Sequence, residues 1–237
     1  MALIFAHRGF SDRYPENTML SFQKAIEAGC DGIELDVQLS KDGEPVIIHD
    51  ERLKRTTGAP GYVWEYTLAE LKKLDASGKY HRLYGKNGIP TLREYFALTA
   101  DRTVITNIEL KTEVNTYPGI EKKVLELLDE YKLRNRVIVS SFHPDSLIRF
   151  RKLAPDVSCG LLEGDKTVGM AKYAKKLGMD FLNLRHELVN EACVREAEVY
   201  GIRINAWTVN KKEEIQRLKQ LRVYGLIGNN PEAMKKI

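Results

Sequence analysis

The chain has 237 residues, of which 43% are hydrophobic and 30% are charged, and its formal net charge is +4 at pH 7. This balance is typical of a globular protein with a sizeable core. The 37 basic residues form no dense stripe with interleaved aromatics, and no apolar run approaches the ~20 residues of a membrane span, so we expect neither nucleic-acid binding nor stable membrane insertion.

Apolar, strand-like runs alternate with amphipathic helical patterns along the chain. The strands are predicted at residues 3–6, 32–39, 103–111, 136–140, 157–161, 181–184, 202–207 and 223–227. The helices are predicted at residues 18–28, 120–131, 144–153, 168–177, 190–200 and 211–221. This strand count, in a chain near the usual ~250 residues, favours an α/β protein of the (β/α)8 TIM-barrel type. A doubly wound open sheet is the alternative, but no glycine-rich dinucleotide fingerprint follows any of the strands.

Residues 51–88 depart from this alternation. The turn Lys41-Asp42-Gly43 returns the chain into another apolar run, residues 45–48, and further turns and one short helix follow. We predict a single barrel domain over residues 1–237, with residues 51–88 as a small insertion after the second strand. Because loops that follow barrel strands lie on the active-site face, this insertion is expected to shape substrate access.

Two carboxylates, Glu34 and Asp36, lie in the middle of an otherwise apolar strand. Since side chains alternate along a strand, both carboxylates project from one face and the neighbouring apolar residues from the other. Two ionised carboxylates in a core lose hydration and repel each other, which is costly without compensation. A divalent cation is the simplest compensation, and a half-buried strand with its polar face in water is the alternative.

Other apolar strands also run into polar residues. His7 and Arg8 follow the first strand, and His49 follows the run at residues 45–48. Glu109 and Lys111 share one face of the strand at residues 103–111. A lone histidine at a strand end is more often structural than catalytic, but this combination of residues favours an active site.

Carboxylate oxygens are hard ligands that suit Mg²⁺ or Ca²⁺, so Glu34, Asp36 and Glu109 are predicted to bind one divalent cation. His7 and His49 are predicted to be the acid–base pair, since histidine titrates near neutral pH. Glu16 and Asn17 begin the first predicted helix, and we expect them to be capping residues; Asn17 or Thr18 is the expected N-cap.

Together these segments resemble the glycerophosphodiester phosphodiesterase family. The matching strings, in the family's order, are Ala6-His7-Arg8-Gly9, Pro15-Glu16-Asn17-Thr18, Ile33-Glu34-Leu35-Asp36-Val37, Lys41-Asp42-Gly43, Val46-Ile47-Ile48-His49-Asp50, Ile108-Glu109-Leu110-Lys111, Ser140-Ser141-Phe142 and Ala206-Trp207-Thr208-Val209-Asn210. The one departure is Gly228, where the family often has threonine.

The resemblance implies the same three carboxylate ligands and assigns His7 as the base and His49 as the acid, although the reverse is compatible with the same residues. It implies attack on phosphorus by the neighbouring glycerol hydroxyl, and direct attack by water is also compatible. Arg8 and Lys111 would bind the phosphate oxygens. For Lys111, a salt bridge to Glu109 or Asp36 is the alternative. Trp207 would form a wall of the glycerol pocket or belong to the core.

The predicted function is therefore metal-dependent hydrolysis of small-molecule glycerophosphodiesters to sn-glycerol 3-phosphate and an alcohol. One alternative is a phospholipase-type phosphodiesterase acting on lysophospholipids or inositol lipids. Another is a non-catalytic phosphate-binding barrel. Either a monomer or a homodimer is compatible with the sequence.

A cytoplasmic location is expected from the N-terminal sequence and from the cysteines. The N-terminus lacks a basic region followed by a long apolar stretch, so a signal peptide is not expected. The chain's three cysteines, Cys30, Cys159 and Cys193, are odd in number and widely spaced, which favours buried, reduced thiols over disulfides or a zinc site.

Overall fold

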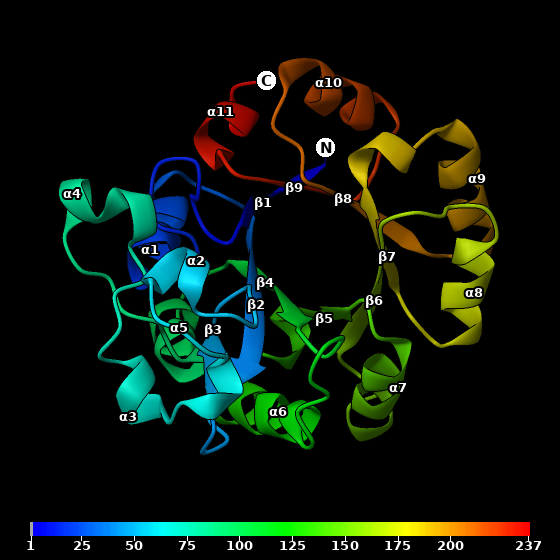
Figure 1. Cartoon of the computed structure of the whole chain (residues 1–237). Helices are drawn as coiled ribbons and strands as arrows, with labels where there is room; N and C mark the ends of the chain where they lie inside the picture. The colour runs from blue at the N-terminus through cyan, green and yellow to red at the C-terminus, as the bar shows by residue number, and fades with distance from the viewer. Residues whose placement is uncertain (1) are drawn as a thin grey trace.

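The computed structural model describes residues 2–237, and its centre is a closed barrel of eight parallel strands (Figure 1). Around the barrel the strands run in the order β1-β9-β8-β7-β6-β5-β4-β2, and β1 pairs with β2 to close it. Their bounds are β1 (Leu3–His7), β2 (Gly32–Leu39), β4 (Ile105–Leu110), β5 (Val137–Ser141), β6 (Ser158–Glu163), β7 (Phe181–Arg185), β8 (Arg203–Trp207) and β9 (Gly225–Gly228). The predicted (β/α)8 fold is confirmed.

Helices surround the barrel and alternate with the strands (Figure 1). They are α1 (Met19–Glu27), α5 (Leu92–Thr99), α6 (Ile120–Glu130), α7 (Pro144–Leu153), α8 (Met170–Lys176), α9 (Glu191–Tyr200), α10 (Lys212–Gln220) and α11 (Pro231–Lys235). The sequence analysis missed α5, although Thr91 and Glu94 form the capping box that begins it. Within residues 2–237, no helix is long and apolar enough to cross a membrane.

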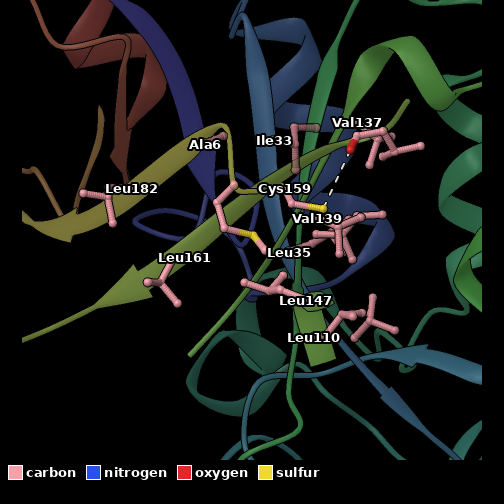
Figure 2. Packing of buried hydrophobic residues seen from close by; sticks show 14 of the residues in the cluster. Ala6, Ile33, Leu35, Leu110, Val137, Val139, Leu147, Cys159, Leu161 and Leu182 are labelled. Atoms are coloured by element: carbon pink, nitrogen blue, oxygen red, sulfur yellow. Dashed lines mark hydrogen bonds between the residues drawn. The ribbon is translucent and has the colours of Figure 1, made fainter. Parts of the chain in front are cut away.

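The main hydrophobic core lies between the outer face of the barrel and these helices. Figure 2 shows part of it, with Leu147 from α7 near Val139 of β5 and Cys159 of β6, two neighbouring strands. Burying each such aliphatic side chain contributes roughly 1.5–3 kcal/mol to stability. This packing determines which face of each strand points outward, and therefore leaves the alternate residues facing the barrel interior.

Inside the barrel, apolar residues occupy the end from which the strands start. Phe5, Ile138, Phe181 and Ile227 form a separate buried cluster. Phe5 lies two residues before His7 on β1, so the two side chains share the inner face. The interior is thus closed by apolar side chains below, and its polar residues are left near the carboxyl ends of the strands, where barrel active sites lie.

Residues 51–88 follow β3 (Pro45–Ile47), which pairs antiparallel with β2 outside the barrel. They contain more short helices than the one predicted, namely α2 (Lys54–Thr57), η1 (Val63–Glu65), α3 (Leu68–Leu71), η2 (Gly78–Tyr80) and α4 (His81–Tyr84). A hydrophobic cluster of their own includes Leu53, Val63 and Leu71 and extends to Val46 and Ile48. In Figure 1 this cyan segment lies on the side of the barrel formed by β2 and β3, near α1 and α5.

Candidate active site

Three buried carboxylates meet inside the barrel. Glu34 and Asp36 project inward from β2, and Glu109 projects from the adjacent strand β4, in register with Asp36. One oxygen from each of the three lies within 4.8 Å of the others. The register of two neighbouring strands therefore brings together the carboxylates that the sequence separates by more than 70 residues.

The proximity of these carboxylates changes how easily each one ionises. Burial raises the pKa of Glu34 well above its usual value, and the negative charges of Asp36 and Glu109 raise it further. Burial and Asp36 also raise the pKa of Glu109. Asp36 shifts the other way: burial opposes its ionisation, but the charge of Arg8 and other nearby positive groups lower its pKa. The cluster thus holds more negative charge than its surroundings compensate.

The donor set fits a hard divalent cation. Asp36 Oδ1 is buried and has no hydrogen-bond partner among the described residues. A buried carboxylate oxygen without a partner costs free energy, and a coordinated cation would remove that cost together with the repulsion within the cluster. Carboxylate oxygens are also among the hard ligands that suit Mg²⁺ and Ca²⁺.

Residues from the loop after β1 contact this cluster. Asn17 Nδ2 donates a 2.8 Å hydrogen bond to Asp36 Oδ2, and Arg8 Nε lies 3.5 Å from the same oxygen. Arg8 also donates from its backbone N–H to Glu34. The N-cap of α1 is Thr18. Asn17 and Glu16 are therefore not helix caps as expected: Asn17 binds Asp36, and Glu16 accepts a 2.9 Å hydrogen bond from Arg8.

His7 lies at the end of β1 with its Nε2 3.9 Å from a Glu34 oxygen. Its Nδ1 lies 2.7 Å from Asn229 Oδ1. Because an amide oxygen only accepts, this contact assigns the ring proton to Nδ1 and leaves the Nε2 lone pair free. Burial, together with the charge of Arg8, lowers the pKa of His7 to about 4. At neutral pH the ring is thus an uncharged proton acceptor, and the sequence analysis missed the residue that orients it, Asn229.

Asn229 directly follows Gly228, the last residue of β9. A Cβ at position 228 would lie 2.2 Å from the backbone oxygen of Val209 and 2.4 Å from Met234 Sδ. A side chain there would require one of these neighbours to move. The glycine is therefore a packing requirement of this chain.

His49 lies just beyond β3, and its Nδ1 is 2.7 Å from Asp50 Oδ1. The sequence alone left open whether Asp50 orients His49, and the structure shows the contact. The second ring nitrogen, Nε2, is left for the pocket that His49 lines.

A pocket at the carboxyl ends of the strands connects these groups. It is lined by His7, Arg8, Glu34, His49, Asn107, Glu109, Phe142, Leu162, Trp207, Thr208 and Ile227. Charged and polar residues from β1, β2, β4 and His49 face apolar residues from the other side of the barrel. Trp207 and Phe142 meet edge to face with ring centroids 5.8 Å apart, and Trp207 Nε1 donates to the Asn183 carbonyl. Trp207 therefore lines the pocket. Phe142, to which the sequence analysis gave no role, lines it as well.

Lys111 is placed differently from the other predicted substrate-binding residues. Its Nζ lies 2.7 Å from Glu109 Oε1. The structure thus contains the salt bridge that the sequence analysis gave as the alternative to phosphate binding.

Comparison with known proteins agrees with this geometry. The model of the Glycerophosphoryl diester phosphodiesterase family matches residues 7–233. A glycerophosphodiester phosphodiesterase of Caldanaerobacter subterraneus is 42% identical over 98% of this chain and 96% of its own length. Another, from Bacillus altitudinis, is 41% identical over 100% of this chain and 98% of its own length.

A solved structure of an Oleispira antarctica phosphodiesterase in complex with the product sn-glycerol-3-phosphate superposes with a TM-score of 0.91. It is 28% identical and covers 100% of this chain and 96% of that protein. The carboxylate cluster that could hold a metal agrees with the metal dependence of the family. The chain therefore belongs to the glycerophosphoryl diester phosphodiesterase family and is an enzyme that hydrolyses glycerophosphodiesters.

Proposed function

We propose that Glu34, Asp36 and Glu109 hold one Mg²⁺ or Ca²⁺ ion at the base of the pocket. The observation that carries this proposal is the buried carboxylate cluster itself, which includes the unpartnered Oδ1 of Asp36. When bound, the cation supplies positive charge against the phosphate oxygens of the substrate. The products are sn-glycerol 3-phosphate and an alcohol such as choline or ethanolamine.

His7 acts as the general base and His49 as the general acid. The nucleophile, either the neighbouring glycerol hydroxyl or a water, loses its proton to His7 Nε2 as its oxygen bonds to phosphorus. Attack by the glycerol hydroxyl gives a cyclic phosphate, which a water then opens to sn-glycerol 3-phosphate. The bond from phosphorus to the alcohol oxygen breaks, and His49 Nε2 gives that oxygen a proton. The assignment is supported by the depressed pKa of His7, which keeps it an acceptor, and by the position of His49 in the lining of the same pocket.

Arg8, which lies beside the carboxylate cluster, binds a phosphate oxygen. Lys111 contributes positive charge to the site through its ion pair with Glu109. Arg8 lines the pocket while its Nη1 is held by Glu16, which leaves the guanidinium a fixed direction. Trp207 and Phe142 pack against the carbon atoms of the substrate. This division into a charged and an apolar wall suits a small molecule with a phosphate at one end of a carbon chain.

The chain as a whole forms one barrel domain in which residues 51–88 are an insertion beside the pocket. A cytoplasmic location is supported by the three cysteines, all of which are buried and free. We expect a monomer or a homodimer, which sedimentation would distinguish.

The experiment is a coupled assay for glycerol 3-phosphate after the enzyme has been stripped with EDTA. Glycerophosphocholine and glycerophosphoethanolamine are the substrates, with Mg²⁺ or Ca²⁺ added back in separate titrations. Activity restored by either ion supports the proposal, and activity that survives complete stripping contradicts it. Faster turnover of lysophospholipids than of the deacylated diesters would favour the phospholipase-type alternative.

A further inference from the structure

Arg55, in the segment outside the barrel, joins two loops at the mouth of the pocket. Its Nε and Nη2 lie 2.5 and 2.9 Å from the two oxygens of Asp50. Its Nη1 and Nη2 each lie 2.8 Å from the oxygens of Glu16. Both contacts use the planar fork of the guanidinium in the bidentate manner that gives arginine–carboxylate pairs their directional strength. Arg55 therefore fixes the plane of the Asp50 carboxylate.

Asp50 in turn restricts the orientation of the His49 ring. Burial would raise the pKa of Asp50, but its hydrogen bonds to His49 and Arg55 hold that pKa well below its usual value. The ionised carboxylate accepts a 2.7 Å hydrogen bond from His49 Nδ1–H, and this assigns Nε2 as the nitrogen that faces the pocket.

The backbone of His49 is held separately, from the inside. Gln38 is buried, and its Nε2 lies 2.9 to 3.1 Å from the carbonyl oxygens of Ile48, His49 and Asp50. Tyr117 donates a 2.8 Å hydrogen bond to Oε1, the side-chain oxygen of Gln38. With the backbone held in this way, the freedom left to His49 is the rotation of its side chain. Asp50 is the group that restricts it.

We propose that Arg55 is a positioning residue for His49, acting through Asp50, and that residues 51–88 thereby set the efficiency of proton transfer to the leaving alcohol. This inference rests on the proposed function, in which His49 is the general acid. A misdirected acid slows catalysis steeply, because a displacement of about 1 Å can cost roughly 10²-fold.

A purely structural role for Arg55 makes a different prediction. If Arg55 only fastens residues 51–88 to the loop at Glu16, its loss would lower the amount of folded enzyme and would reduce turnover of every substrate equally. If it positions the general acid, its loss matters only when the leaving oxygen needs a proton. The dependence of the defect on the leaving group therefore separates the two roles.

The experiment compares two glycerophosphodiesters, one with choline and one with p-nitrophenol as the leaving alcohol. The nitrophenolate departs without protonation, whereas choline requires it. The variants are Arg55→Gln, Arg55→Lys and His49→Ala. The matched control is Arg52→Gln, since Arg52 lies three residues earlier and binds Tyr62 rather than Asp50. Each ratio of the two activities is measured on one preparation, so it does not depend on the folded fraction.

We expect Arg55→Gln to lower kcat for glycerophosphocholine by about tenfold or more, with little change for the nitrophenyl ester. Arg55→Lys retains the charge without the fork and should recover part of the loss. His49→Ala should lose about 10²–10⁴-fold with the choline ester. In the His49→Ala background, Arg55→Gln should cause no further loss in the reaction of the choline ester.

The two proposals fail in different ways. Full activity of His49→Ala on glycerophosphocholine would contradict the proposed function, whatever Arg55→Gln does. A large loss in His49→Ala together with an unchanged activity ratio in Arg55→Gln would leave the proposed function standing and overturn the role of Arg55. An additive loss in the double variant would overturn it as well.

Discussion

Lys111 and Glu109 form an ion pair at the mouth of the barrel, with Nζ and Oε1 2.7 Å apart and each side chain only 10% exposed. The residues lie two apart along the chain, so they share the inner face at the end of β4. Lys111 therefore neutralises one of the three candidate metal ligands. Burial opposes its charge, but Glu109 and Asp36 outweigh burial and raise the pKa of Lys111 above its usual value.

Lys111→Met should destabilise the metal-free enzyme more than the metal-loaded one. Removing the ammonium leaves Glu109 as an uncompensated buried charge, a change that typically costs about 3–5 kcal/mol. A bound divalent cation would supply the missing positive charge. The free energy of unfolding measured in urea, with EDTA and then with saturating Mg²⁺ or Ca²⁺, tests this. An equal loss under both conditions would mean that Lys111 does not balance the metal ligands.

Glu109→Gln should raise the concentration of metal needed for half-maximal activity by about tenfold or more, because a neutral amide replaces one of three anionic ligands. The measurement is a metal titration of the EDTA-stripped variant. The matched control is Glu113→Gln, since Glu113 follows the same strand but binds the backbone N–H of Phe142. An unchanged titration for Glu109→Gln would show that the ligand set is incorrect.

Gln38→Leu should lower both stability and turnover. The substitution leaves three consecutive carbonyls around His49 without their donor, and each orphaned buried group costs about 1–3 kcal/mol. The side-chain NH2 of Gln38 carries only two protons, so at most two full hydrogen bonds are lost. We expect a total loss of about 2–6 kcal/mol in urea unfolding, together with a lower kcat. Tyr117→Phe removes only the hydroxyl that holds Gln38 and should cost about 1 kcal/mol. A stable Gln38→Leu enzyme with normal kcat would argue against a role of Gln38 in holding the backbone around His49.

Asp75, which lies within residues 51–88, should make the free energy of unfolding depend on pH in the acid range. Burial would raise its pKa, but hydrogen bonds from Ser77, Asn87 and His81 lower that pKa to about 2. The folded-state pKa lies below the ordinary aspartate value of 3.8, so the unfolded chain binds more protons between these two pH values. The stabilisation is complete above pH 3.8 and is lost as the pH falls towards 2.

The test compares wild type with Asp75→Asn by urea unfolding at about pH 5 and about pH 3. The difference in free energy of unfolding between the two proteins should shrink by about 1 kcal/mol at the lower pH. Asp101→Asn, at an exposed aspartate, serves as the control and should show the same difference at both values. A constant difference for Asp75→Asn would show that these hydrogen bonds do not favour its ionised form.

The parts of this enzyme that could be predicted were those with a local signal. The alternation in β2 placed Glu34 and Asp36 on one face, and the order of strands and helices predicted a barrel. The helix α5 also has a local signal in the capping box of Thr91 and Glu94. The short helices between residues 51 and 88 lacked the periodicity that would have revealed them.

The sequence by itself determined the barrel, its outward and inward strand faces, and the residue types available at the carboxyl ends of the strands, because period-two alternation and turn chemistry act over a few neighbouring residues. Only the tertiary structure decided which of these residues touch. Asn229 reaches His7 across 222 positions and Arg55 reaches Glu16 across 39. Such contacts depend on barrel closure and on how the loops fold over the mouth, and these arise from packing of the whole chain rather than from any local preference.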